Sequence, residues 1–211
     1  MLDGIERQVL DCTAELQTKN DARDRALVDS RDVVRQAARA IRALHRGEWA
    51  EAEDIVSRGR EIVRSTRSHL ENFPDVYWAG YVQDAQKEFA EASLLTAMIA
   101  GSPIPTRVDL GVEVAPYLNG LAEAASELRR YILDIVRHGG LDRLREAERA
   151  LKVMDDVYSN LITVDYPDAI TGGLRRTTDA LRAVLERTRG DLTITSRQAE
   201  LEQALRGHPV T

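Results

Sequence analysis

Apolar residues recur along most of the chain at intervals of three and four positions, the spacing that gathers them on one face of an α-helix. Glycine or proline interrupts this pattern, and all six prolines stand at such interruptions. Because a proline inside a helix costs about 3 kcal/mol, their placement favours long, unbroken helices between them. The pattern predicts helices over residues up to 46, 48–72, 76–100, 116–138, 141–160 and 174–189, and a short last helix that begins at 195.

The connections between these helices point to the same fold class. Irregular loops are predicted at 102–114 and 163–173, and the four-residue alternation of apolar and polar residues over 192–195 is too short for a sheet. Thr195, followed three residues later by Gln198, has the spacing of a helix capping box. The sequence therefore predicts an all-α protein, a bundle of about seven helices that forms a single domain over residues 1–211.

The composition limits the cellular setting. With 43% hydrophobic residues in 211 the chain has enough apolar material for a core, but no apolar run approaches the roughly 20 residues of a membrane span. Its first residues lack the basic and apolar segments of a secretory signal. A single cysteine, Cys12, excludes an internal disulfide framework and a cysteine-based zinc site. We expect a cytoplasmic protein without a membrane partner.

The formal net charge of −6 argues at first against a nucleic-acid-binding protein, but the charges are unevenly placed. Five arginines recur at intervals of three and four on one predicted helix face, with Asp32 among them. They are Arg31, Arg35, Arg39, Arg42 and Arg46. One interpretation is a surface that binds RNA phosphates without reading bases. The alternative is a solvated face whose arginines pair with acidic neighbours.

Two clusters of acidic residues lie on consecutive predicted helices. Asp84, Glu88 and Glu91 share one helix face, because their spacings are four and three, and Glu123 and Glu127 share a face of the next long helix. Like charges at this spacing repel, and a divalent cation would offset that repulsion. Carboxylate oxygens suit Mg²⁺, which supports hydrolysis of a phosphodiester or pyrophosphate bond. From spacing alone, the second pair is more typical of a solvated surface, because two glutamates on a polar helix face usually face water.

Other catalytic motifs are absent from the sequence. It contains no glycine-rich phosphate loop, no Gly-x-Ser-x-Gly and no His-Glu-x-x-His. No glutamate stands three residues before a histidine, as a ferritin-like di-iron site would require.

Several segments, in the same order along residues 28–191, resemble motifs of the translin superfamily, closest to its translin-associated factor X type. They are Ser30-Arg31-Asp32-Val33-Val34 with Ile41-Arg42-Ala43-Leu44-His45-Arg46, Gln86-Lys87-Glu88-Phe89-Ala90-Glu91-Ala92, the motif over 117–130, and Asp165-Tyr166-Pro167-Asp168-Ala169 with parts of 174–191. No single motif is highly specific, whereas their order and spacing together are.

The resemblance implies an all-α protein that assembles into an octameric, barrel-like shell and a Mg²⁺-dependent endoribonuclease whose acidic residues face the interior. Carried over position by position, the catalytic and metal-binding acids fall on Glu88, Glu91, Glu123 and Glu127. Mn²⁺ is expected to substitute for Mg²⁺. The family has Asp where this chain has Glu123, and the longer side chain places its oxygens differently for an ion that demands regular octahedral geometry.

We therefore expect a homo-oligomeric, Mg²⁺-dependent endoribonuclease that cleaves single-stranded RNA or short RNA with exposed strands. Two alternatives stay open at this point. One is a translin-like shell that binds RNA without cleaving it. The other is an all-α nucleoside-triphosphate pyrophosphohydrolase, an enzyme class that also builds Mg²⁺ sites from paired glutamates on helices.

Overall fold

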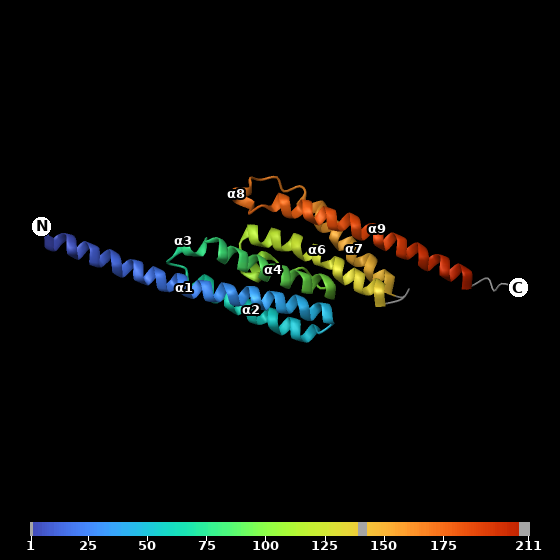
Figure 1. Ribbon diagram of the computed structural model, residues 1–211, viewed down its shortest axis with the longest axis horizontal. Helices are drawn as coiled ribbons and strands as arrows, with labels where there is room; N and C mark the ends of the chain where they lie inside the picture. The colour runs from blue at the N-terminus through green and yellow to red at the C-terminus, as the bar shows by residue number, and fades with distance from the viewer. Residues whose placement is uncertain (1, 139–142, 207–211) are drawn as a thin grey trace.

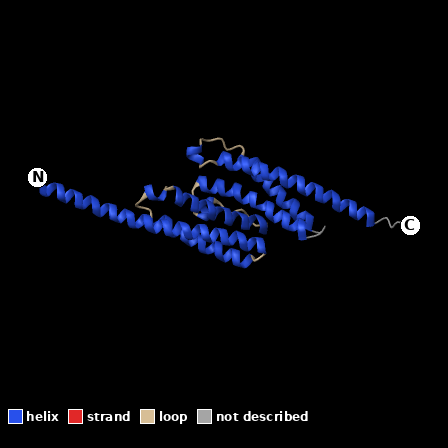
Figure 2. Ribbon diagram, in the orientation of Figure 1, coloured by secondary structure: helices blue, strands red, loops and turns tan. Residues whose placement is uncertain are grey.

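The computed structural model describes residues 2–138 and 143–206, and within that part every regular element is helical (Figure 2). The all-α prediction is confirmed. The long helices are α1 (Leu2–Arg46), α2 (Trp49–His69), α4 (Gly80–Ala100), α6 (Val114–His138), α7 (Leu144–Leu161) and α9 (Leu174–Arg206). Single helical turns form α3 (Pro74–Tyr77), α5 (Arg107–Leu110) and α8 (Asp168–Thr171). The predicted helix start at 141 lies outside the described residues.

Helices α4 and α6 lie side by side at the centre of the molecule (Figure 1). On one side α1 packs against α4 together with α2, and on the other side α7 and α9 pack against α6 and against each other. The two ends of the chain point in opposite directions, so that the first part of α1 and the last part of α9 project beyond the bundle. Among the described residues, no helix has the length and apolar character needed to cross a membrane.

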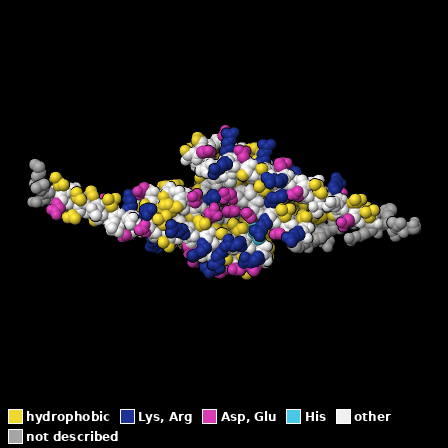
Figure 3. All heavy atoms as spheres, in the orientation of Figure 1, with side chains coloured by type: hydrophobic (Ala, Val, Ile, Leu, Met, Phe, Trp, Pro, Cys, Tyr) yellow, Lys and Arg dark blue, Asp and Glu magenta, His cyan; other side chains and the backbone are white. Residues whose placement is uncertain are grey.

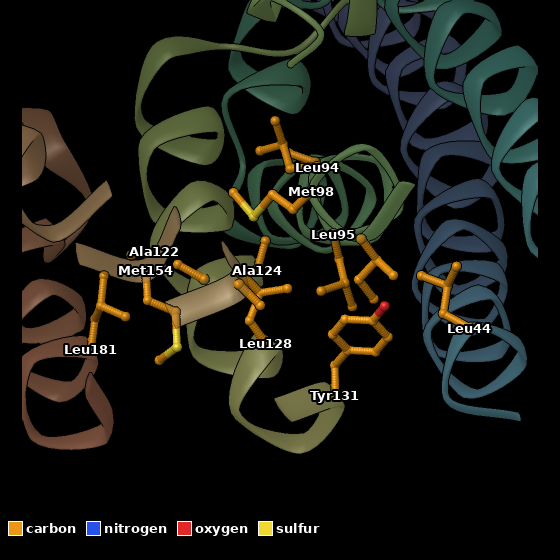
Figure 4. Close-up of a cluster of buried hydrophobic side chains, with 14 of the residues drawn as sticks. Leu44, Leu94, Leu95, Met98, Ala122, Ala124, Leu128, Tyr131, Met154 and Leu181 are labelled. Carbon is orange, nitrogen blue, oxygen red and sulfur yellow. The ribbon is translucent and has the colours of Figure 1, made fainter. Parts of the chain in front are cut away.

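The main hydrophobic core surrounds the contact between α4 and α6 and draws on all six long helices, α2 among them through Ala52 and Val63 (Figure 4). Its labelled members are Leu44 of α1, Leu94, Leu95 and Met98 of α4, Ala122, Ala124, Leu128 and Tyr131 of α6, Met154 of α7 and Leu181 of α9. Each buried Leu or Met side chain contributes about 1.5–3 kcal/mol. The alanines leave room for the two central helices to approach closely.

Gly120 of α6 marks the closest approach of the two central helices. A Cβ atom at this position would lie 2.8 Å from the carbonyl oxygen of Lys87 and 2.9 Å from Cβ of Ala90. Both distances are shorter than van der Waals contact, so any other residue would force the helices apart. Glycine at 120 therefore fixes α6 against the turn of α4 that carries Lys87 to Glu91.

Asn119, a buried residue of α6, makes hydrogen bonds to elements near the C-terminal end of the chain. The Asn119 side-chain amide donates to the carbonyl oxygen of Thr171 at 2.7 Å, and its side-chain oxygen accepts from Thr177 Oγ1 at 2.8 Å. These bonds tie α8 and the start of α9 to α6.

The predicted break between 174–189 and a helix starting at Thr195 is wrong, because α9 continues through Gly190. Thr195 is not a helix cap: its hydroxyl donates to the carbonyl oxygen of Asp191 at 3.0 Å, inside the helix. A glycine within a helix costs only about 1 kcal/mol relative to alanine. Arg129 of α6 holds α9 on both sides of Gly190, through Thr188 Oγ1 at 3.1 Å and Asp191 at 2.8 Å. Such tertiary contacts outweigh the local cost.

Candidate metal centre

Three glutamates from the two central helices meet at one point. Glu88 and Glu91 project from the same face of α4, and Glu123 projects from α6. Each offers a carboxylate oxygen, and these oxygens all lie within 4.8 Å of one another. Asp84, one turn before Glu88, is exposed and lies outside the group. The structure thus brings together three of the four acids that the resemblance marks as catalytic.

Glu91 is the most deeply placed of the three, with only 9% of its surface exposed. Burial, followed by the negative charges of Glu123, Glu88 and Glu127, raises the pKa of Glu91 to about 8. Lys87 opposes this shift but does not cancel it. A buried carboxyl group surrounded by like charges is an environment that a bound cation would stabilise.

Lys87 lies among these carboxylates, although the sequence pattern gave it no role. Its Nζ atom is 2.9 Å from Oε1 and 2.8 Å from Oε2 of Glu123, and 3.2 Å from Oε1 of Glu88. Burial lowers the pKa of Lys87, but the hydrogen bond and charge of Glu123, with those of Glu88, outweigh it and raise the pKa. The ammonium group is therefore a counter-ion for two of the three acids.

Glu127 stands one helical turn beyond Glu123 and has a different partner. Its Oε2 atom lies 2.9 Å from Nε2 of His45 on α1, and this hydrogen bond lowers the pKa of Glu127 against the opposing effect of burial. His45 directly precedes Arg46 of the arginine face in the sequence, but its side chain is only 2% exposed and contacts α6. Glu127 still acts on the group through its charge, which contributes to the raised pKa of Glu91.

All five arginines singled out on α1 are exposed. Arg35 pairs with Asp32 at 2.6 Å, and Arg46 pairs with Glu48. The other three make no ion pair with any residue that the structure describes; they are Arg31, Arg39 and Arg42. Figure 3 shows Asp and Glu side chains gathered near the centre of one face, with Lys and Arg side chains beside them over α1 and α2. A basic band thus borders an acidic centre.

The donor set fits a hard divalent cation. Carboxylate oxygens are the ligands that Mg²⁺ and Mn²⁺ take in proteins, and Mg²⁺ usually keeps several waters besides one or two carboxylates. Glu88, Glu91 and Glu123 supply such oxygens from two helices held together at Gly120. His45 orients a fourth carboxylate close by, as partners of metal-site groups commonly do.

Three features of this site were missed by sequence reasoning. Lys87, Gly120 and the inward direction of His45 all depend on contacts between helices, which a periodic pattern does not encode. One signal was available for Gly120, since a glycine inside a long helical pattern often has a packing reason.

Comparison with known proteins gives a consistent result. No protein-family model matches the chain. A protein of Methanocaldococcus jannaschii is 32% identical over 193 residues, which cover 90% of this chain and 84% of that protein. The solved structure of AfC3PO with duplex RNA has a TM-score of 0.83 and 30% identity, and the match covers 90% of this chain and 97% of that chain. AfC3PO alone gives the same score. Apo-NeC3PO, at 19% identity and a TM-score of 0.78, shares the fold.

The similarity to AfC3PO, at 30% identity, extends over 90% of this chain and nearly the full length of that chain. C3PO proteins are members of the translin family. The chain therefore belongs to the translin superfamily.

Proposed function

We propose that this protein is a Mg²⁺-dependent endoribonuclease that cleaves single-stranded RNA, or short RNA with exposed strands. The observation that carries the proposal is the convergence of Glu88, Glu91 and Glu123 within 4.8 Å on two rigid helices. The similarity to AfC3PO, whose structure has been solved with duplex RNA, supports RNA as the substrate class.

Each acid has a role in this proposal. Glu88, Glu91 and Glu123 hold the ion, and Glu127, oriented by His45, adds a negative charge beside them. When bound, Mg²⁺ supplies charge stabilisation at the scissile phosphate and a stronger nucleophile from water. The buried position of Glu91 makes its ionisation dependent on that charge, since its pKa is about 8 in the absence of an ion.

The arginine face of α1 is the proposed RNA-binding surface. Arg31, Arg39 and Arg42 are exposed and make no ion pair with described residues, so their guanidinium groups are available to phosphates. Arg35 and Arg46 belong to the same face but must share their charge with Asp32 and Glu48. Because the surface is small and local, the salt dependence of binding should be shallow.

We further propose that the protein acts in the cytoplasm as a single-domain subunit of a homo-oligomeric, barrel-like shell, an octamer by family resemblance. The projecting ends of α1 and α9 support assembly, because both carry large apolar side chains in water. They are Ile5, Val9, Leu10 and Leu16 on α1 and Ile194, Leu201 and Leu205 on α9. Exposed apolar surface of this extent is typical of interaction sites.

The proposal is tested by incubating end-labelled single-stranded RNA with the purified protein in Mg²⁺ or in EDTA. Internal cleavage with Mg²⁺ and none with EDTA is expected. Glu123→Gln should abolish cleavage while oligomer size and RNA binding persist, and Asp84→Asn, which removes an exposed acid from α4, should cleave normally. Cleavage at the wild-type rate by Glu123→Gln would show that the site is elsewhere.

A second candidate function is RNA binding without catalysis. One observation favours it: Lys87 already neutralises part of the acidic group, so the carboxylates have a counter-ion without a metal. RNA binding with no Mg²⁺-dependent cleavage would select this candidate.

The remaining alternative is a nucleoside-triphosphate pyrophosphohydrolase. Nucleoside triphosphates added to the same assay test it, since release of pyrophosphate with uncut RNA would indicate that enzyme.

A further inference from the structure

Lys87 is a charged side chain in contact with the acidic group, and the proposed reaction does not use it. We propose that the Lys87 ammonium group is a resident counter-ion that competes with the divalent cation for Glu123 and Glu88, and thereby sets the metal concentration at which the centre fills. The inference rests on the proposed metal centre and adds a regulatory element to it.

The Lys87 ammonium group contacts the same carboxylate oxygens that would bind the metal ion. Nζ lies 2.8–2.9 Å from both carboxylate oxygens of Glu123, so no oxygen of that residue is free of it. A Mg²⁺ ion binds its oxygens at about 2.0–2.1 Å and tolerates little distortion. A metal ion on Glu123 would place a second cation on the same carboxylate, and the repulsion between the two cations favours loss of the ammonium contact. The contact with Glu88, at 3.2 Å, places the same ammonium between the two helices.

The backbone of Lys87 is fixed, and its side chain is not. Its carbonyl oxygen lies at the tight contact with Gly120, which anchors the residue against α6. The side chain is 25% exposed, so the ammonium has a path to water. Exchange of cations at the carboxylates thus requires rotation of one side chain and no movement of a helix.

The choice of lysine is unusual in this chain. Of its 29 basic residues only Lys19, Lys87 and Lys152 are lysines. Arginine would hold Glu123 in a rigid two-pronged pair, whereas lysine presents a compact charge on a flexible stem. Position 87 therefore carries the cation that is more easily displaced.

The test measures Mn²⁺ binding to the full-length protein by titration calorimetry, for the wild type, Lys87→Met, Lys87→Arg and Lys152→Met. Lys87→Met removes the competing charge and should bind Mn²⁺ about tenfold more tightly or better. Lys87→Arg keeps the charge and should show no gain. Lys152→Met removes an equal charge from an exposed pair with Asp156 on α7 and should match the wild type.

The outcomes separate this inference from the metal centre itself. Equal or weaker Mn²⁺ binding by Lys87→Met, with normal binding by the wild type, would overturn the competition and leave the centre intact. Absence of Mn²⁺ binding in both proteins would overturn both. Thermal unfolding supplies a second readout. Lys87→Met should melt below the wild type in EDTA, because Glu123 and Glu88 lose their counter-ion, and it should gain more from Mn²⁺ than the wild type does. Lys87→Gln serves in the same assays if the Met variant does not fold.

Discussion

Nε2 of His45 lies 2.9 Å from Oε2 of Glu127, which joins α1 to α6 across 82 positions of sequence. The imidazole is almost fully buried, and its Nδ1 atom has no hydrogen-bond partner among the described residues. Glu127 is thus the hydrogen-bond partner of the imidazole ring. The bond lowers the pKa of Glu127 and orients its carboxylate beside the three acids of the candidate centre.

Replacing His45 by Phe should therefore affect both stability and catalysis. Loss of the donor leaves a half-buried carboxylate unpaired, at a cost of about 1–3 kcal/mol. Loss of orientation should lower the RNA cleavage rate about 10- to 100-fold, the usual effect of removing a group that positions a metal site. Denaturant unfolding and single-turnover cleavage measure the two effects.

The matched control is His69→Phe, because His69 is also largely buried but lies at the end of α2, where Nδ1 bonds to the carbonyl oxygen of Ser65. This variant should lose stability and keep its cleavage rate per folded molecule. If the His45 variant also cleaves at the wild-type rate per folded molecule, Glu127 needs no orientation from α1.

Gly120→Ala tests the helix contact that assembles the centre. The added methyl group would meet the backbone of Lys87 and Cβ of Ala90 at less than 3.0 Å, so α6 must shift away from α4. We expect a loss of about 1–3 kcal/mol in the free energy of unfolding, together with weaker Mn²⁺ binding.

Gly190→Ala is the opposite case, since nothing lies within 4 Å of its Cβ position in α9. This variant should gain about 0.5–1 kcal/mol in urea unfolding. Equal effects of the two substitutions would contradict the close packing at 120.

The raised pKa of Glu91 predicts a pH dependence in the absence of metal. The folded protein binds the proton with a pKa of about 8, against an ordinary value of 4.5 for the unfolded chain. Folding is thus favoured by the protonated form, and the free energy of unfolding contributed by Glu91 falls as the pH rises from about 4.5 to about 8. Above that range the loss is complete.

Thermal unfolding in EDTA measures this effect as the difference between Glu91→Gln and the wild type. The variant should melt several degrees higher at pH 9 and close to the wild type near pH 4.5. Asp84→Asn, an exposed acid on the same helix, should show no such difference. Added Mg²⁺ should stabilise the wild type at pH 9 more than the variant. A melting-temperature difference between Glu91→Gln and the wild type that does not change with pH would argue against a raised pKa at Glu91.

The arginine face is tested by RNA affinity as a function of salt. Arg39→Gln and Arg42→Gln should each weaken binding for all RNA sequences alike and reduce the salt slope by about 1, as expected for phosphate contacts. Arg58→Gln, whose guanidinium pairs with Asp54 at 2.7 Å on α2, should change neither quantity. Unchanged slopes for both α1 variants would place the RNA on another surface.

The sequence pattern predicted those features that depend on neighbouring residues. Helical spacing alone placed Glu88 and Glu91 on one face, and Pro103, Pro105 and Pro167 marked the loops. The pattern wrongly predicted a helix end near Gly190. Glycine disfavours a helix locally, but the contacts of Arg129 with α9 outweigh that cost. It also could not pair Lys87 with Glu123, or His45 with Glu127, since those contacts depend on how α1, α4 and α6 pack.

The central claim is that Glu88, Glu91 and Glu123 hold the metal with which this protein cleaves RNA. The most direct measurement is anomalous X-ray scattering from crystals soaked in Mn²⁺. We predict one anomalous peak in contact with carboxylate oxygens of these three residues, with the Lys87 ammonium group moved off Glu123. A saturating soak that leaves this position without a peak, and Lys87 still bound to Glu123, would contradict the account.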